Sequence, residues 1–546
     1  MLLSGAQILV ECLKEQNVDT VFGFPGGTVL NIYDELYKHK EDINHILTTN
    51  EQAAAHAADG YARSTGKVGV CIATSGPGAT NLVTGVATAY MDSVPVVYIT
   101  GNVGLDYLGK DSFQEVDIAG ITMPITKHNF IVKDISLLAD TIRRAFDIAR
   151  SRRPGPVLID IVKDVTEPDN IYEYEKMDID LTYKRDYKLN KKDIKELISL
   201  IRKSKKPLIC AGGGAIISGA SQQVLSFSEV IDAPVCDSLM GKGIVDTEND
   251  NYIGMVGIHG TNTANKALKE CDLLVAVGMR FGDRLTGNSD SFAEDTKVIH
   301  IDVDRAEINK NVMSYMGIVG DVRTVLEAIL KELDGKGISF SHEKWQKHIE
   351  ELKESDKECE ESNNLTAPYV IKCLNGFMGE DDIIVTDVGQ HQMWTAKNFH
   401  FRKPHRFLTS GGLGTMGYGL GAALGAKIGH PNLNVVNISG DGCFRMNMGE
   451  IITCVNYNAK VIDIVFNNSS LGMVRQMQTL FCEKRYSETD LSNNADYCKM
   501  SEAMGAKSFR ITKKEEVNEV LKKAFSCDTT VVIECIINRE DMVGYN

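Results

Sequence analysis

Two short polar motifs in the last third of the sequence have the residue types and the spacing of a metal–phosphate site. Gly440-Asp441-Gly442 follows an apolar run at 434–438, and Asn467-Asn468 follows a second apolar run at 460–466. If both runs are neighbouring parallel strands, their carboxyl ends place an aspartate carboxylate and an asparagine amide side by side. Such oxygen ligands suit Mg²⁺, and glycines let backbone N–H groups approach phosphate oxygens. The motifs therefore predict a magnesium–diphosphate site.

Each motif alone has a simpler interpretation, since Asp-Gly is common in turns and Asn-Asn in polar loops. The pair is more specific because 24 residues (443 to 466) separate Gly442 from Asn467. This length is enough for a helix that returns the chain to the same edge of a parallel sheet. We expect that helix over 446–457.

The two motifs resemble the cofactor motif of thiamine-diphosphate enzymes. The resemblance implies that Asp441, Asn468 and the backbone carbonyl of Ser470 hold Mg²⁺ on the diphosphate of thiamine diphosphate. It also implies that the cofactor lies between the pyrophosphate domain of one subunit and the pyrimidine domain of another. A homodimer or homotetramer is therefore expected.

Glu51 precedes an Ala-rich segment that predicts a helix, with the glutamate in or just before its first turn. The simpler interpretation is a glutamate that complements the helix dipole. The cofactor requires a carboxylate hydrogen-bonded to a pyrimidine nitrogen, in a dry pocket that favours the protonated form of the acid. Because the segment from Glu51 to Arg63 resembles the glutamate motif of the family, we assign Glu51 to this role.

Stretches along the chain, from about residue 4 to about residue 543, resemble the large catalytic subunits of the acetohydroxyacid synthase (acetolactate synthase) family. They lie at 24–27, 74–81, 111–115, 126–129, 153–156, 212–214, 280–284, 300–304, 389–394 and 411–417. The resemblance implies decarboxylation of pyruvate and transfer of the two-carbon unit to a second 2-keto acid. With pyruvate or 2-ketobutyrate as acceptor, the products would be 2-acetolactate or 2-aceto-2-hydroxybutyrate, at the start of branched-chain amino acid biosynthesis. A small regulatory subunit is also implied.

The same resemblance assigns roles to individual residues. Those implied to bind thiamine diphosphate are Glu51, Val388, Gln390, His391, Gly414, Met416, Gly440, Asp441, Gly442 and Asn468, with Met416 wedged under the cofactor rings. Those implied to act in catalysis are Glu51, Gln114 and Lys163, and those implied to contact substrate are Gly27, Phe113, Lys127, Arg284 and Met477.

The biosynthetic members of the family also carry FAD. A predicted strand at 206–211 runs into Gly212-Gly213-Gly214, and two aspartates close a later predicted strand at 297–303, a pattern that supports a flavin but is weak by itself. The residues implied to contact FAD are Arg153, Gly212, Gly213, His259, Arg284 and Asp302. The flavin-free catabolic members resemble this part of the chain much less.

The sequence departs from the family at a few positions. Met477 stands where a tryptophan is usual, so a flexible thioether replaces a flat ring, and we expect a weaker preference for 2-ketobutyrate over pyruvate. Nine residues follow the predicted strand 531–537, whereas the family usually continues into a tail that folds over the site. Gly421 and Cys443 replace the usual proline and serine, with little expected effect.

Three blocks of alternating β-rich and helical segments must position these residues. They predict an α/β protein of three domains, each a mainly parallel sheet flanked by helices. We expect a pyrimidine-binding domain at 1–170, a central Rossmann-like FAD-binding domain at 190–340 and a pyrophosphate- and magnesium-binding domain at 365–546. Charged linkers are expected at 172–195 and 343–364, the second forming a solvated helix with one packed face.

The composition narrows the class of protein. There are 74 acidic and 59 basic side chains, a formal charge of −15, which argues against a nucleic-acid surface. No apolar run reaches the roughly 18 residues of a membrane span, no leader pattern begins the sequence, and the 13 cysteines include no CxxC pair. These features favour a cytoplasmic protein with reduced thiols. Because exposed charges are screened, we expect Lys127, Lys163, Arg284 and Mg²⁺ to attract anionic substrates despite the net charge.

Two alternatives differ from this interpretation in chemistry. One is a sibling thiamine-diphosphate enzyme, a simple 2-keto acid decarboxylase or oxidase. The other is a non-catalytic flavin-binding or regulatory paralogue, which predicts a broken Glu51, Asp441 or Asn468, whereas all three are intact.

Overall fold

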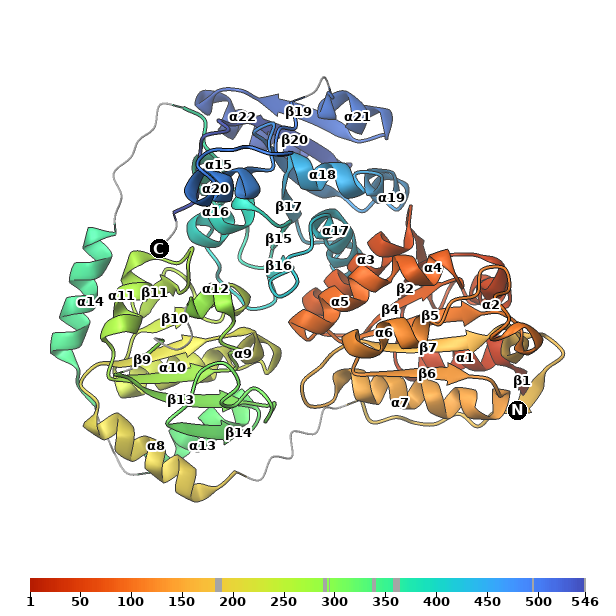
Figure 1. Cartoon of the computed structure of the whole chain (residues 1–546), viewed down its shortest axis with the longest axis horizontal. Helices are drawn as coiled ribbons and strands as arrows, with labels where there is room; N and C mark the ends of the chain where they lie inside the picture. The colour runs from red at the N-terminus through yellow and green to blue at the C-terminus, as the bar shows by residue number, and fades with distance from the viewer. Residues whose placement is uncertain are drawn as a thin grey trace.

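The computed structural model describes residues 1–181, 189–287, 292–293, 295–335, 340–356, 364–492 and 495–544. Three six-stranded parallel sheets, each flanked by helices, follow one another along the chain (Figure 1). The predicted fold class, an α/β protein of three parallel-sheet domains, is confirmed. None of the described helices is both long enough and apolar enough to cross a membrane.

The first domain is built on a sheet with the strand order β3-β2-β4-β5-β7-β6. Its strands are β2 (Thr20–Phe24), β3 (Asn44–Leu47), β4 (Gly69–Ala73), β5 (Val96–Asn102), β6 (His128–Val132) and β7 (Val157–Val162). Its helices are α1 (Gly5–Glu15), α2 (Leu30–Lys38), α3 (Glu51–Thr65), α4 (Pro77–Asn81), α5 (Val83–Asp92), α6 (Ile118–Thr122) and α7 (Leu138–Arg150). A small antiparallel pair joins β1 (Leu2–Ser4) to β8 (Ile171–Glu173).

The central domain has the strand order β11-β10-β9-β12-β13-β14. Its strands are β9 (Pro207–Ala211), β10 (Val235–Asp237), β11 (Tyr252–Met255), β12 (Leu273–Val277), β13 (Lys297–Asp302) and β14 (Met316–Val319). Its helices are α8 (Lys191–Lys203), α9 (Gly213–Ile217), α10 (Ser221–Ile231), α11 (Asn262–Glu270), α12 (Asp283–Thr286), α13 (Val322–Asp334) and α14 (Glu343–Ser355).

The third domain has the strand order β16-β15-β17-β18-β20-β19. Its strands are β15 (Ile383–Thr386), β16 (Phe407–Thr409), β17 (Val435–Gly440), β18 (Val461–Asn467), β19 (Lys507–Ile511) and β20 (Val531–Ile536). Its helices are α15 (Ala367–Leu374), α16 (Gln390–Asn398), α17 (Tyr418–Gly429), α18 (Asp441–Asn447), α19 (Glu450–Asn456), α20 (Gly472–Phe481), α21 (Tyr497–Ala503) and α22 (Val517–Ser526).

The segment between the two polar motifs differs from its prediction. The single helix expected over 446–457 is wrong, because α18 already begins at Asp441 and a break at Met448 and Gly449 separates it from α19. Gly440 is extended and caps α18, and an acidic first residue is favourable at the positive end of the helix dipole. Asp441 is therefore part of a helix N-terminus and not of a free turn.

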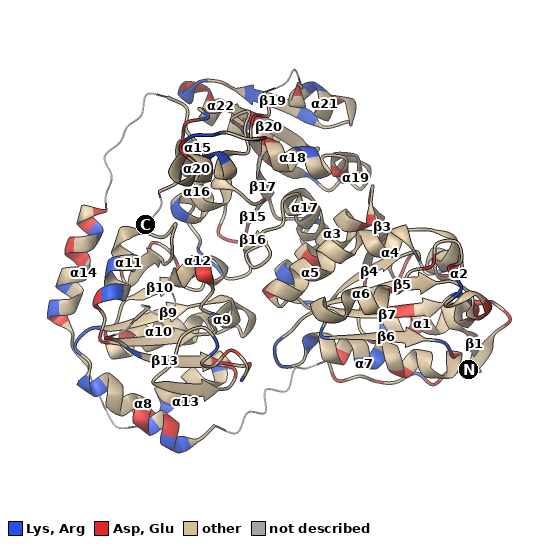
Figure 2. Cartoon of the chain, viewed as in Figure 1, with Lys and Arg blue, Asp and Glu red and all other residues tan. Residues whose placement is uncertain are grey.

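The charged linkers are only partly within the described residues. In the second, α14 packs one face inward through Trp345 and Ile349, and the Trp345 Nε1 donates to the carbonyl of Pro207 at 3.0 Å. This confirms the predicted helix with one packed face, while 357–363 and, in the first linker, 182–188 lie outside the described residues. Lysines and acidic residues alternate along α8 and α14, so neither helix carries charge of one sign alone (Figure 2).

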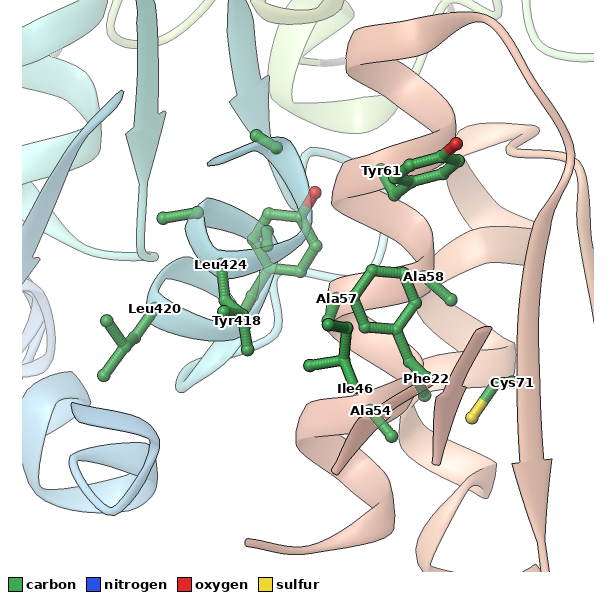
Figure 3. Packing of buried hydrophobic residues seen from close by; sticks show 14 of the residues in the cluster. Phe22, Ile46, Ala54, Ala57, Ala58, Tyr61, Cys71, Tyr418, Leu420 and Leu424 are labelled. Atoms are coloured by element: carbon green, nitrogen blue, oxygen red, sulfur yellow. The ribbon is translucent and has the colours of Figure 1, made fainter. Parts of the chain in front are cut away.

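The first and third domains are joined by close packing of α3 against α17 (Figure 3). A Cβ added to Gly60 would lie 2.2 Å from the carbonyl oxygen of Ala422, and one added to Gly425 would lie 1.9 Å from that of Ala57. Glycine within a helix usually costs about 0.5–1 kcal/mol relative to alanine. Here the missing side chains let the two helix backbones touch.

A buried polar network closes one end of this interface. The Arg63 guanidinium donates to Asp59 at 2.6 Å, to Asp92 at 3.0 Å and to the carbonyl of Thr409 at 2.9 Å. The Tyr418 hydroxyl also donates to Asp59, at 2.7 Å. Since buried charges destabilise a fold unless they are paired, this network requires one relative placement of the two domains.

Gly425→Ala should lower the free energy of unfolding by roughly 1–3 kcal/mol, because the added methyl group meets the α3 backbone and the helices must separate. Chemical denaturation would measure the loss. Gly335→Ala is the matched control, since its nearest contact would be an ordinary 3.4 Å. Equal effects of the two substitutions would show that the close approach of α3 and α17 has no energetic importance.

Candidate functional site

A cavity lies at the carboxyl edge of the third sheet, between the ends of β15, β17 and β18. Each of these strands is followed by a segment that the sequence analysis singled out. The predicted residues that line the cavity are Val388, Gln390, His391, Met416, Gly440, Asp441, Gly442, Asn468 and Ser470. The structure therefore brings the metal and diphosphate candidates together around one space.

Asp441 is the charged group of this cavity. Its side chain is 2% exposed; Oδ1 accepts a hydrogen bond from the Gly442 N–H at 3.0 Å, and Oδ2 has no partner among the described residues. Burial raises the pKa of Asp441 to about 6. A buried carboxylate oxygen without a donor requires a cation or a proton, so this site has the chemistry of a metal site.

Asn468 and Ser470 form the other side of the same edge. β17 and β18 pair in parallel with Gly440 opposite Phe466, so the residues after them are neighbours. The Asn468 Oδ1 accepts from the Ser470 N–H at 3.0 Å, and the Ser470 hydroxyl donates to the carbonyl of Thr489 at 2.8 Å. These bonds fix the turn that carries the two predicted oxygen ligands.

The loop with Met416 is held by Asp387, a residue that the sequence analysis missed. Asp387 Oδ1 accepts from the Gly417 N–H at 2.8 Å, and Oδ2 accepts from the Gly419 N–H at 3.0 Å. Gly414 and Gly417 have φ values of +70° and +85°, a conformation that favours glycine. Asp387 directly follows a predicted strand and precedes the Val388 segment. This position at a strand end is the sequence feature that could have identified it.

His391 and Gln390 begin α16 at the cavity wall. His391 is buried, its Nε2 has no partner among the described residues, and burial lowers its pKa to about 3, so the ring is neutral. The Gln390 amide donates to Gln476 Oε1 and to the carbonyl of Asp541, both at 2.9 Å. The first of these bonds links α16 to α20.

The segment after β20 reaches the cavity wall, which Ile537 lines. Val543 N–H donates to Gln476 Oε1 at 2.9 Å, and the Gln476 amide donates back to the Val543 carbonyl at 2.7 Å. The carbonyl of Gly544 lies 3.0 Å from Nδ1 of His259 in the central domain. The glutamine side chain pairs with the backbone of Val543 as a neighbouring strand would, and this holds the segment against α20.

Glu51 lies at the carboxyl edge of the first sheet. It is the first residue of α3, Asn50 caps that helix by accepting from the Ala53 N–H at 2.9 Å, and the glutamate side chain is nearly buried. The Asn81 amide donates to Glu51 Oε2 at 2.9 Å. Asn81 ends the stretch 74–81 that carried the family resemblance, but its role had no separate signal in the sequence.

The other first-domain candidates share this edge. Gly27 follows β2, and Lys163 follows β7 with its Nζ 3.6 Å from Glu167. Gln114 has φ +60° and lies against Gly76, while Phe113 beside it is 88% exposed. None of the described residues lining the third-domain cavity comes from this edge.

Lys127 is not at this edge, and its assignment to substrate is withdrawn. It stands at the amino end of β6, whereas Glu51 stands beyond the carboxyl end of β3. Its Nζ donates to the carbonyls of Ile148 and, at 2.7 Å, Ser151, at the end of α7. Burial lowers the pKa of Lys127 to about 8. The lysine therefore satisfies the free carbonyls of a helix C-terminus.

The flavin candidates meet where the central sheet faces the first domain. A Cβ on Gly212 would lie 2.3 Å from the carbonyl oxygen of Gly278, so the ends of β9 and β12 approach closely. Asp302 ends β13, and burial raises its pKa to about 7. Arg153 reaches over from the first domain and pairs with Glu307 at 2.7 Å.

Two further candidates are on the surface of helices. Arg284 lies on α12, largely exposed, with its Nε 3.8 Å from Asp283. Met477 is half-buried on α20, the helix that borders the cavity through Met473 and Val474. Neither lines the cavity itself.

Known proteins are similar to this chain over nearly its whole length. Family models for thiamine pyrophosphate enzymes match the N-terminal TPP binding domain at 3–121, the central domain at 194–329 and the C-terminal TPP binding domain at 387–535. A probable acetolactate synthase large subunit of Methanocaldococcus jannaschii is 45% identical, covering 98% of this chain and 92% of the relative. The acetolactate synthase large subunit of Corynebacterium glutamicum is 45% identical (99% and 88% covered), and the acetolactate synthase of Mycobacterium leprae 44% (99% and 88%).

Lys127→Met should destabilise the protein by about 1–2 kcal/mol, because the carbonyls at the end of α7 lose their donor. The melting temperature should fall by roughly 2–4 °C for a domain of this size. Lys133→Met, at an exposed position, is the control and should leave it unchanged. A Lys127→Met protein that melts like the control would contradict the structural role assigned to this lysine.

Proposed function

This chain belongs to the acetolactate synthase large subunits of the thiamine-pyrophosphate enzyme family, and we propose that it decarboxylates pyruvate and joins the two-carbon unit to a second 2-keto acid. The acceptors are pyruvate, giving 2-acetolactate, and 2-ketobutyrate, giving 2-aceto-2-hydroxybutyrate, in branched-chain amino acid biosynthesis. The observation that carries the proposal is the cavity in which Asp441, Asn468 and Ser470 meet at the ends of two parallel strands.

The cavity residues fit magnesium and the diphosphate of the cofactor. Asp441 offers a buried carboxylate oxygen without a donor among the described residues, and Asn468 and Ser470 add neutral oxygens. We propose that these three residues hold Mg²⁺, while Gly440, Gly442 and Gln390 face the phosphates. Thiamine diphosphate, when bound, supplies the electron sink that allows a 2-keto acid to lose CO₂.

The chain's own residues would orient and protonate that group. Met416 lines the cavity on a loop that Asp387 fixes, and it would pack beside that group. The Glu51 carboxylate would exchange a proton with the pyrimidine ring, and the Asn81 amide orients this carboxylate by binding Oε2. Gln114, Lys163, Gly27 and Phe113, which share the edge with Glu51, would contact the reacting keto acid.

We propose that two copies of the chain complete each site. Glu51 lies in the first domain, and the described residues lining the cavity all belong to the third. A homodimer or homotetramer would place Glu51 of one copy over the cavity of another. The relatives named as large subunits support a small regulatory subunit as a further partner.

We also propose FAD in the central domain. Gly212 and Gly278 lie close together at the carboxyl ends of β9 and β12, the edge at which α/β sheets bind dinucleotides. Gly213 begins the helix after β9, Asp302 ends β13, and Arg153 pairs with Glu307. His259, beside Gly544, would contact the flavin, and Arg284 would contact flavin or acceptor from α12. The twelve described cysteines are unpaired and eight of them are buried, which suits the reducing cytoplasm that we propose as the compartment.

The proposed activity is tested by incubating the purified protein with pyruvate, Mg²⁺ and thiamine diphosphate and assaying acetolactate and acetaldehyde. Acetolactate should form, and Glu51→Gln should lower the rate by about 10²–10⁴-fold, the usual contribution of a positioned acid–base group. Acetaldehyde without acetolactate would indicate the sibling decarboxylase. No turnover would indicate a non-catalytic paralogue.

Asp441→Asn should weaken magnesium-dependent cofactor binding by at least roughly tenfold, since even an outer-shell partner contributes that much to metal affinity. Trp394 lines the cavity, so its fluorescence reports binding once the second tryptophan is removed by Trp345→Phe. Asp463→Asn is the matched control, because Asp463 is equally buried on β18 but does not line the cavity. Unaltered binding to Asp441→Asn would overturn the metal assignment.

Met477→Trp should raise the preference for 2-ketobutyrate over pyruvate, because a flat ring replaces a flexible thioether on α20, the helix that borders the cavity. Competition between the two keto acids at fixed concentrations gives the product ratio. Met500→Trp, at an exposed position on α21, serves as control. An unchanged product ratio would contradict the assignment of Met477 to the binding of the acceptor keto acid.

A further inference from the structure

Glu450, the first residue of α19 in the third domain, is fully buried and directed at the first domain. Its Oε1 accepts from the backbone N–H of Thr49 at 2.9 Å and also from the Thr49 hydroxyl. Its Oε2 accepts from the Thr453 hydroxyl at 2.7 Å. Both oxygens of a buried carboxylate are therefore satisfied, one of them by a residue 401 positions away in the sequence.

Thr49 belongs to the short connection that delivers Glu51. The connection between β3 and α3 contains three residues, Thr48, Thr49 and Asn50, and ends where Asn50 caps α3. Glu51 follows at once, so the backbone position of Thr49 determines where the glutamate side chain starts. The Asn81 amide holds the far end of the same side chain.

On its other side, Glu450 is tied to the metal edge of the cavity. α18 begins at Asp441, and only Met448 and Gly449 separate it from Glu450. Asn447 at the end of α18 donates to the carbonyl of Gly417 at 2.5 Å, in the loop that carries Met416. Glu450 thus lies on the same short stretch of chain as a metal candidate and a cofactor-loop contact.

We propose that Glu450 is a positioning residue for Glu51: by holding Thr49, it fixes the point of the backbone from which the activating carboxylate extends toward the cavity of the neighbouring copy. The inference rests on the proposed function, in which Glu51 exchanges a proton with the cofactor. Glu450 itself touches neither cofactor nor substrate. Displacing a reacting group by about 1 Å can lower a rate about 10²-fold, so a contact of this kind can have a large effect.

A second contact between the same two domains serves as a control for a merely structural role of Glu450. The Tyr457 hydroxyl, at the other end of α19, accepts from the Leu47 N–H at 2.9 Å and so also joins the third domain to this segment. Leu47 is partly exposed, and it lies four residues before Glu51. Tyr457→Phe therefore removes a contact between the same two domains without releasing Thr49.

The cofactor-free protein gives the first test. Deuterium exchange of backbone amides in a peptide spanning 47–55 should become at least tenfold faster in Glu450→Ala. Glu450→Gln keeps an oxygen for Thr49 and should restore most of the protection. Exchange in a peptide spanning 68–74 should not change. Equal exchange of the 47–55 peptide in wild type and Glu450→Ala would overturn the inference.

The second test measures proton exchange with deuterium at C2 of added thiamine diphosphate, together with its affinity. Glu450→Ala should slow this exchange roughly tenfold to 10²-fold with less than a threefold change in dissociation constant, whereas Tyr457→Phe should change neither. Thr49→Val, which loses only the hydroxyl, should fall between. In a Glu51→Gln background, Glu450→Ala should slow exchange no further.

These outcomes separate the inference from the proposed function. Slowing of the same size in the Glu51→Gln background, or a loss of cofactor affinity that accounts for the slower exchange, would overturn the positioning role. If Glu450→Ala does not fold, Thr49→Val and Glu450→Gln decide the same question by the same cycle. Failure to form acetolactate would refute the proposed reaction, whereas proton exchange at C2 still tests the role of Glu450.

Discussion

The contact between the backbones of α3 and α17 is the constraint on which the rest of the site depends. Gly60 and Gly425 allow the two helices to approach until backbone oxygens fill the space of a side chain. Glu51 is the first residue of α3, and Met416 stands two residues before α17 begins. A single interface therefore fixes the backbone position of both Glu51 and the loop that carries Met416, and neither can shift without the other domain.

Buried charge enforces the same arrangement. Arg63, Asp59 and Asp92 are removed from water, and the two aspartates also receive the Tyr418 hydroxyl and the Gly411 and Gly412 N–H groups. Separating the domains would leave these charged groups without partners, and the loss of a partner from a buried ion pair strongly destabilises a fold. The formal charge of −15 has little influence here, because charges on the surface are screened within about 10 Å at 0.1 M salt.

The fold and the third-domain cavity could be predicted from the sequence because both depend on local patterns. Buried parallel strands appear in the sequence as apolar runs, and their carboxyl ends place the next residues at a shared edge. Asp441 and Asn468 were identified in this way, whereas His391 was assigned from the family resemblance. Glu450 and the tail segment at 541–544 could not be predicted in this way, since their partners are distant in the sequence and include backbone groups. The assignment of Lys127 to substrate was wrong for a related reason. Its ammonium group donates to backbone carbonyls at a helix end, and such partners cannot be recognised from residue types.

The α3–α17 contact also limits how this protein can be re-engineered. At positions 57, 60, 422 and 425 the chain has only alanine and glycine, and the backbone distances leave little room for larger residue types. A mutagenesis library that randomised these helices would consist largely of variants in which the domains no longer dock. Diversity is better concentrated on α20, where Met473 and the exposed Val474 line the cavity without supporting the interface.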